Sequence, residues 1–120
     1  MLKFLIHITC GPADPTRAAL AFLVAKTAAE EGHAVSLFLA GDAVTLLKDE
    51  HLKSVVGLGT GKLEDHFNAL LQRGVRFHLS GMSSKARGVS EQDLQGKAAE
   101  FAMPAVLVRL AAEADRVLTY

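Results

Sequence analysis

The stretch LKFLIHIT, Leu2–Thr9, is almost continuously apolar and is interrupted only by Lys3 and His7. Such a run is typical of a strand that is buried on both faces of a parallel sheet. CGPADP follows as a turn, in which Asp14 and Pro15 are the capping and first helical residues that open a helix. The helix TRAALAFLVAKTAAEEG leads to a second apolar strand, AVSLFLAG, so the first third of this 120-residue chain predicts strand, helix and strand in succession.

The same alternation continues to the end of the chain. KLEDHFNALLQRG predicts a helix, VRFHLS a third strand, SSKARG one helical turn, VSEQDLQG a capped turn, KAAEFA a strand, MPAVLVRLAAEA a helix and DRVLTY a final strand. DAVTLLK predicts a short helix capped by Asp42, and SVVGLGTGK a glycine-rich loop at an active-site rim or subunit contact. We expect one domain, residues 1–120, with a mostly parallel five-stranded sheet in a three-layer α/β/α, flavodoxin-like fold.

Composition restricts the classes of function. Hydrophobic residues make up 50% of the chain, and 13 basic residues balance 13 acidic ones. Because nucleic-acid binding depends on neutralising phosphates, zero net charge argues against it, and it leaves self-association unopposed. MLKFLIHI is shorter than a signal-peptide core, and no apolar run approaches the ~18 residues of a membrane span, so we expect a cytoplasmic protein without membrane contact.

The ends of the predicted strands indicate where a ligand would bind. In the flavodoxin-like strand order 2-1-3-4-5, the first and third strands are neighbours, and ligands occupy the crevice beyond their carboxyl ends. Cys10 follows the first strand and Ser80 ends the third, while Gly41 and Asp42 follow the second. This order predicts that the single thiol of the chain lies beside Ser80.

Cys10 has two interpretations. A lone cysteine is often a small buried hydrophobic residue without a reactive role. Alternatively, the start of the following helix, with Arg17 or Arg87, stabilises a reactive thiolate, although the nearby charge of Asp14 opposes this.

The serines and cations after the third strand also have alternatives. Ser80 and Ser83 would be nucleophiles only with a base in reach, and LSGMSSK lacks the GxSxG nucleophile pattern, so hydrolysis ranks last. Ser83 is expected to cap a helix. Lys85 and Arg87 are either solvated or, with the serine hydroxyls and free backbone N–H groups, hold a small anion.

Metal and nucleotide sites have little support. His33, His51 and His66 are expected to be exposed, and His7 and His78, in adjacent predicted strands, could meet, but two ligands do not form a metal centre. GLGTGK lacks the first glycine and the final Ser or Thr of a P-loop. We therefore expect neither a metal nor a cofactor.

Four stretches resemble the DsrE/DsrF-like family of small sulfur-relay and related proteins: GPADPTRAALAF, GHAVSLFLAGDAV, SGMSSKARGVSEQDL and ADRVLTY. They cover nearly the whole chain in the family's order and spacing. The resemblance implies a flavodoxin-like or closely related fold, assembly into homotrimers or homohexamers and, in active members, a cysteine persulfide. The persulfide cysteine stands in a CG pair after the third strand, where this chain has Ser80 and Gly81, and the second cysteine of some relatives corresponds to Ser83.

This departure from the family pattern is chemically large, because a serine hydroxyl cannot carry a persulfide sulfur. Two hypotheses follow. In the first, the chain is a binding protein rather than an enzyme, and it holds a small anionic ligand or a sulfur-relay partner protein. In the second, the displaced thiol of Cys10 makes it a sulfur carrier or transferase. The residues expected to bind are Ser80, Gly81, Ser83, Lys85, Arg87, Gly41, Asp42 and Asp14. The apolar run AMPAVLVRLAA exceeds one buried stripe, so part of it is expected to face another subunit.

Overall fold

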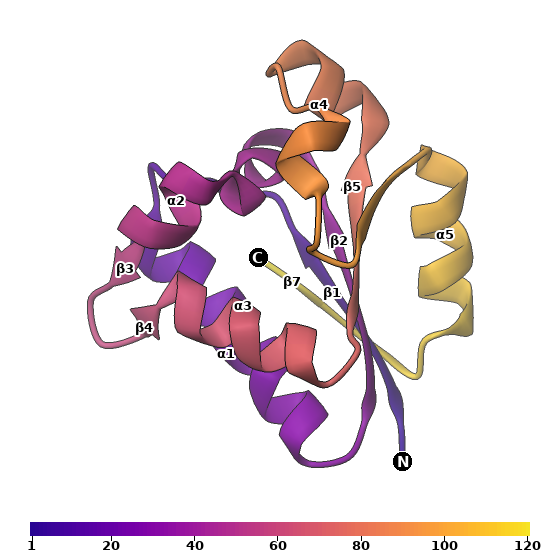
Figure 1. The fold of residues 1–120 in the computed structure, drawn as a ribbon. Helices are drawn as coiled ribbons and strands as arrows, with labels where there is room; N and C mark the ends of the chain where they lie inside the picture. The colour runs from indigo at the N-terminus through magenta and orange to yellow at the C-terminus, as the bar shows by residue number, and fades with distance from the viewer.

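Five parallel strands form the centre of the computed structural model, which describes all residues 1–120 (Figure 1). They are β1 (Lys3–Ile8), β2 (Ala34–Leu39), β5 (Arg76–Ser80), β6 (Ala99–Ala102) and β7 (Arg116–Thr119). The helices are α1 (Pro15–Glu30), α2 (Asp49–Ser54), α3 (Leu63–Gln72), α4 (Gly81–Ala86) and α5 (Pro104–Glu113), with 3₁₀ helices η1 (Gly41–Leu47) and η2 (Glu91–Leu94). Helices cover both faces of the sheet, so the predicted three-layer α/β fold is confirmed.

Local signals define several of these elements. The Asp14 carboxylate accepts a hydrogen bond from the Arg17 N–H at 3.3 Å, and Pro15 is the first residue of α1. Gly32, with φ +90°, turns the chain after that helix, in a conformation that other residues rarely adopt. These features confirm the predicted boundaries of α1.

The order of the strands across the sheet is β6-β5-β2-β1-β7. The predicted order 2-1-3-4-5 is therefore wrong, because β5 pairs with β2, and the other edge of β1 pairs with β7. An apolar pattern shows that a strand is buried but does not show which strand lies beside it. The order depends on the side of β2 to which the long connection through α2 and α3 returns.

Two segments between β2 and α3 differ from the sequence prediction. The glycine-rich segment forms a short antiparallel hairpin, β3 (Val56–Gly57) and β4 (Gly61–Lys62). The segment DAVTLLK is a 3₁₀ helix that begins at Gly41, so Asp42 lies inside it and its side chain does not cap it. The carboxylate of Asp42 is free to pair elsewhere.

The first face of the sheet holds most of the core. Helices α1 and α3 pack side by side on it, and the buried cluster comprises 23 residues. The Phe77 ring of β5 stacks on Phe22 of α1 with centroids 6.1 Å apart and contacts Phe67 of α3 at 5.1 Å. These aromatic contacts bind both helices to the middle of the sheet.

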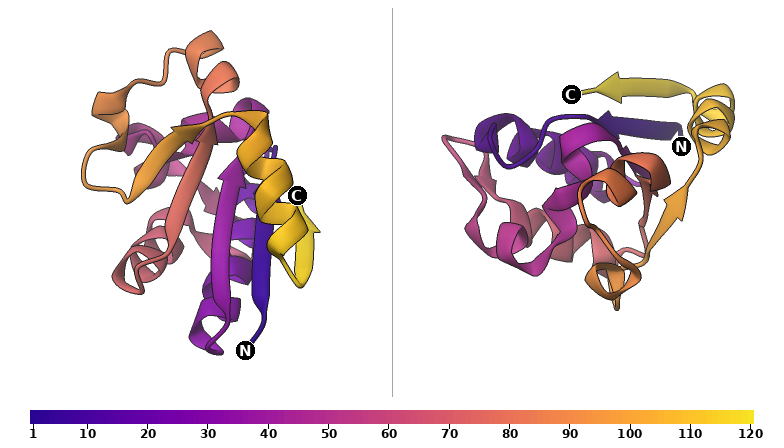
Figure 2. Two further views of the ribbon diagram at one scale, coloured as in Figure 1. Left: turned by 90° about the vertical axis from the view of Figure 1, so that its right-hand side faces the viewer. Right: turned by 90° about the horizontal axis from the view of Figure 1, so that it is seen from above.

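The second face is covered by α5 alone (Figure 2). Its buried cluster has three residues, Leu5, Phe38 and Ala102, and the half-buried residues of α5 pack against them. Val108 of α5 remains 68% exposed, and all four residues of the edge strand β7 are exposed. The second layer is therefore thin, and much of its apolar surface is uncovered.

No helix of this fold combines the length and apolar character that crossing a bilayer requires.

Candidate functional site at the carboxyl edge of the sheet

The residues predicted at the site lie at the carboxyl edge of the sheet, but in two groups. Cys10 follows β1, whereas Ser80 ends β5, and β2 lies between these strands. The predicted contact between the thiol and Ser80 across neighbouring strands is therefore wrong. The cause is the strand order, which inserts β2 and the loop that follows it.

Asp42, in the 3₁₀ helix η1 that follows β2, contacts both groups. A Cβ atom added at Gly11 would lie 2.7 Å from the Asp42 carbonyl oxygen and 2.8 Å from its Cβ, so the loop after β1 packs directly on Asp42. On the other side, the Asp42 carboxylate oxygen Oδ1 lies 3.0 Å from Arg87 Nε. Asp42 is thus a bridge between the Cys10 loop and the α4 turn.

The serines after β5 hold the α4 turn in place. Ser80 Oγ accepts a hydrogen bond from the Ser83 N–H at 3.2 Å, so Ser80 caps α4. Ser83 was expected to be the cap, but its Oγ instead accepts a hydrogen bond from the Gly41 N–H at 2.9 Å. The prediction placed the start of the helix three residues too late, and Ser83 links α4 to the loop after β2.

Of the two cations predicted to hold an anion, Lys85 and Arg87, one is paired within the chain and the other is not. Arg87 donates from Nε to Asp42 and from Nη1 to the Ser83 carbonyl at 3.2 Å, so its guanidinium is engaged within the chain. Lys85 is exposed and forms no ion pair. Of the predicted pair, Lys85 alone keeps its charge free for a ligand or partner.

Cys10 is half-buried and lies in the other group with Asp14. Burial raises the pKa of the Cys10 thiol, and the Asp14 carboxylate raises it further. A backbone hydrogen bond and the Arg17 guanidinium lower this pKa, with smaller effects. The thiol is therefore protonated at neutral pH, which makes it a poor nucleophile.

The cavity nearest the site lies on one side of α4. It has a volume of about 260 Å³ and is lined by Gly81, Ser84, Lys85, Val89 and Phe101. The Ser84 side chain is 1% exposed, and its hydroxyl has no hydrogen-bond partner. Sequence reasoning missed Ser84 as a buried position, although its place four residues after the Ser80 cap puts it on the inner side of the turn. No cavity is lined by Cys10 or Ser80.

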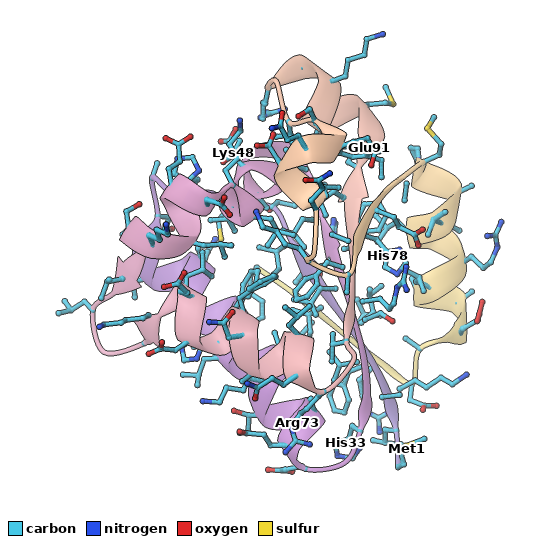
Figure 3. All side chains as sticks on the ribbon, in the orientation of Figure 1. Met1, His33, Lys48, Arg73, His78 and Glu91 are labelled. Atoms are coloured by element: carbon cyan, nitrogen blue, oxygen red, sulfur yellow. The ribbon has the colours of Figure 1, made fainter.

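His7 and His78, which the sequence left open to meet, lie on either side of Phe38. In the sheet register His7 is opposite Phe38, and Phe38 is opposite His78, so all three face α5. Figure 3 shows His78 between the sheet and α5. His78 Nδ1 lies 3.4 Å from Glu100 Oε1, but without hydrogen-bond geometry. The intervening ring prevents a direct contact between the two imidazoles.

The remaining histidines are mostly structural. His66 was expected to be exposed but is buried, and its Nε2 lies 2.8 Å from the Thr60 carbonyl oxygen. His33 Nδ1 accepts a hydrogen bond from the Leu2 N–H at 3.0 Å, near the chain start (Figure 3). The structure contains no group of three or more His, Cys, Asp or Glu side chains placed to bind a metal.

The hairpin lies against the beginning of α1. The Leu58 N–H donates to Thr16 Oγ1 and the Thr60 hydroxyl donates to the Thr16 carbonyl, each at 3.0 Å. Its contact with Thr16 places the hairpin on the Cys10 side of the carboxyl edge of the sheet. Leu58, at the tip of the hairpin, is exposed.

A parallel five-stranded sheet with its polar loops collected at one edge defines a small α/β protein. Two solved structures share this fold. The ychN protein from E. coli matches with a TM-score of 0.82 over 100% of both chains at 24% identity. A protein of unknown function, MTH1491 from Methanobacterium thermoautotrophicum, matches with a TM-score of 0.70 over 100% of both chains at 15% identity.

Sequence comparison gives a more specific result. The model of the DsrE/DsrF-like family matches residues 2–120. The uncharacterized protein MJ0989 from Methanocaldococcus jannaschii is 34% identical over 119 residues, which are 99% of this chain and 100% of that protein. The chain belongs to the DsrE/DsrF-like family, and the resemblance inferred from its motifs is confirmed.

Proposed function

We propose that this chain is a binding member of the DsrE/DsrF-like family that does not carry a persulfide. The observation behind this proposal is the role of Ser80, which stands where the resemblance implies the persulfide cysteine. Its hydroxyl caps α4, and Ser83 and Arg87 tie the same turn to Gly41 and Asp42. The turn is stabilised by polar contacts that need no thiol, so the edge keeps its shape without the sulfur chemistry.

The exposed surface around α4 favours a protein partner over a small ligand. Met82 of α4 is 64% exposed, and Met103, just after β6, is 59% exposed. Met82 and Met103 follow neighbouring strands, because Ser80 and Ala102 are paired in register. Flexible methionine side chains adapt to protein partners, and the unpaired charge of Lys85 lies on α4, three residues after Met82. A sulfur-relay partner protein is therefore the occupant that we propose, and a small anion is the other outcome of the test.

The alternative of a sulfur carrier acting through Cys10 has less support. The thiol is half-buried, and its raised pKa keeps it protonated. Asp42, rather than an open crevice, separates it from the α4 turn. This packing argues against sulfur transfer between Cys10 and the Ser80 position.

Incubation with glutathione persulfide, followed by intact-mass measurement, distinguishes these functions. We expect the native protein to gain no sulfur, as in the thiol-free control Cys10→Ala. The double variant Cys10→Ala/Ser80→Cys, with a thiol at the family position, serves as the positive control. Sulfur added to Cys10 faster than to a free small-molecule thiol would establish the carrier function and refute the proposal.

Affinity capture from the source cell tests the binding surface. We expect Met82→Asp and Lys85→Glu to lose a partner that the native chain retains. Leu58→Asp, a matched change at the exposed apolar tip of the hairpin, should retain it. Equal capture by all variants would place the partner elsewhere. Titration of the native chain with thiosulfate, followed by NMR, shows whether a small anion binds at α4 instead.

We also infer that the chain forms homo-oligomers. The resemblance implies homotrimers or homohexamers, and the uncovered apolar residues Val108, Val117 and Leu118 support an assembly that buries them. Light scattering at working concentration tests this inference, and a monomeric mass would contradict it.

A further inference from the structure

Helix α1 is apolar on almost every side, although the sheet, α3 and the β3–β4 hairpin cover only part of it. The buried residues are Ala18, Ala19, Ala21, Phe22, Ala25 and Ala29, which face the sheet, α3 and the β3–β4 hairpin. On the outward side, Leu20 and Val24 are separated by four residues and are only half-buried. A helix that is hydrophobic all round is normally enclosed on all sides. The outward side of α1 therefore needs a covering element that a single chain does not supply.

A hollow lies beside the outward side of α1. It has a volume of about 370 Å³, and its walls include Phe4 of β1 with Val24, Thr27 and Ala28 of α1. The neighbouring strand β7 has no helix over it, and Leu118, paired with Ile6 and facing the same side as α1, is 37% exposed. The hollow reaches Phe4, which is paired with Arg116 of the edge strand, so the hollow and β7 lie next to each other.

The residues along this side of α1 are arranged symmetrically. They are Arg17, Leu20, Val24, Ala28 and Glu31, the last directly after the helix. Their spacings of three, four, four and three residues place them on one side of the helix, with Val24 at the middle. A basic residue stands at the beginning, an acidic residue at the end, and apolar residues stand between them.

We propose that α1 packs antiparallel against α1 of a second copy of this chain, about a two-fold axis near Val24. The axis places Arg17 of each copy opposite Glu31 of the other. It also places Leu20 of each copy opposite Ala28 of the other, so that the leucine enters the hollow beside that small residue. One patch thereby meets its own copy, as a two-fold interface requires.

Charge complementarity favours this occupant. Arg17 and Glu31 are both exposed, and neither forms an ion pair within its own chain. Packing with the two helices parallel would instead bring like charges together. The two residues are about 21 Å apart along the helix at 1.5 Å per residue. A shallow crossing angle of about 20° keeps both ends of the pair within reach of these long side chains.

The two-fold contact also bears on the size of the assembly. A stable interface buries about 800 Å² on each partner, so the uncovered edge strand β7 must contribute beside α1. On its own, this contact makes a dimer. Combined with a threefold contact elsewhere, it makes a hexamer of two trimers.

Charge reversal tests the arrangement, with mass measured by light scattering and sedimentation velocity over a hundredfold concentration range. We expect Arg17→Glu and Glu31→Arg each to halve the mass of the assembly. The double variant Arg17→Glu/Glu31→Arg should restore it, because the opposite charges then face each other again. Lys53→Glu reverses an exposed charge on α2 and should leave the mass unchanged. Circular dichroism confirms that each variant is folded.

Two results would overturn the proposal. A native mass that neither single reversal changes would show that α1 is not at the interface. Loss of pairing in both single variants without recovery in the double variant would show that Arg17 and Glu31 do not face each other. The variant Ala28→Leu gives a check that is independent of charge. The larger side chain fills the space that Leu20 of the other copy would occupy, so undiminished association of the two copies would contradict the proposed packing.

Discussion

The two faces of the sheet are built very differently. On the first face, α1 and α3 enclose most of a 23-residue core in which three phenylalanine rings meet. On the second face, α5 alone covers three buried residues, and His7 and His78 lie half-buried around Phe38. The free energy of folding should therefore come mainly from the first face. On the second face, a change in charge or in exposed area can alter how α5 packs on the sheet.

The largest effect is expected from Phe77→Ala. The ring is fully buried between Phe22 and Phe67, so its loss removes apolar contacts and leaves a cavity. We expect the free energy of unfolding to fall by about 3–5 kcal/mol, measured by urea denaturation. A loss below about 1 kcal/mol would show that the first face does not dominate stability.

Leu107→Ala makes the corresponding change on the second face. Leu107 is half-buried against Leu5, Phe38 and Ala102, so less area returns to water and no enclosed cavity forms. We expect a loss of about 1–2 kcal/mol, together with faster amide hydrogen exchange in α5 than in α1. A cost equal to that of Phe77→Ala would mean that the two faces contribute alike.

Acidification should weaken the second face selectively. Burial lowers the pKa of His7 and of His78, and for His78 Glu100 raises the pKa while Arg76 lowers it. Each folded-state pKa is thus below the unfolded value of about 6.5, so the unfolded chain binds more protons in the interval between them. Stability is complete above that pH and declines as the pH falls below it.

Urea midpoints measured between about pH 7.5 and pH 5 follow this decline in stability. This pH interval lies above the acidic range in which Asp93 protonates. The double variant His7→Gln/His78→Gln should flatten the profile. An unchanged slope in the double variant would assign the pH dependence to other groups.

The smallest effect is expected from Ser84→Ala. The hydroxyl is buried without a partner, so its removal relieves a desolvation cost and breaks no hydrogen bond. We expect the free energy of unfolding to stay within about 0.5 kcal/mol of the native value or to rise, measured by thermal and urea denaturation. A marked loss would reveal a polar contact of Ser84, in the cavity beside α4.

Local signals predicted the elements more reliably than the site. Asp14 and Pro15 opened α1, and Pro104 opened α5, because capping and a fixed φ act within a few residues. The cap of α4 was assigned to Ser83 instead of Ser80, since either serine satisfies the same local rule. The burial of His66 could not be predicted, because it follows from its contact with the folded-back hairpin at Thr60.

By itself the sequence determined the class of fold, the family and the absence of a cysteine at position 80, because periodicity, caps and motifs are properties of neighbouring residues. Tertiary structure alone decided that β2 lies between Cys10 and Ser80, and that Phe38 lies between His7 and His78. Both depend on which strand edges pair. The pairing of strand edges is set by packing between segments that are far apart in the sequence, so the pattern of adjacent residues does not predict it.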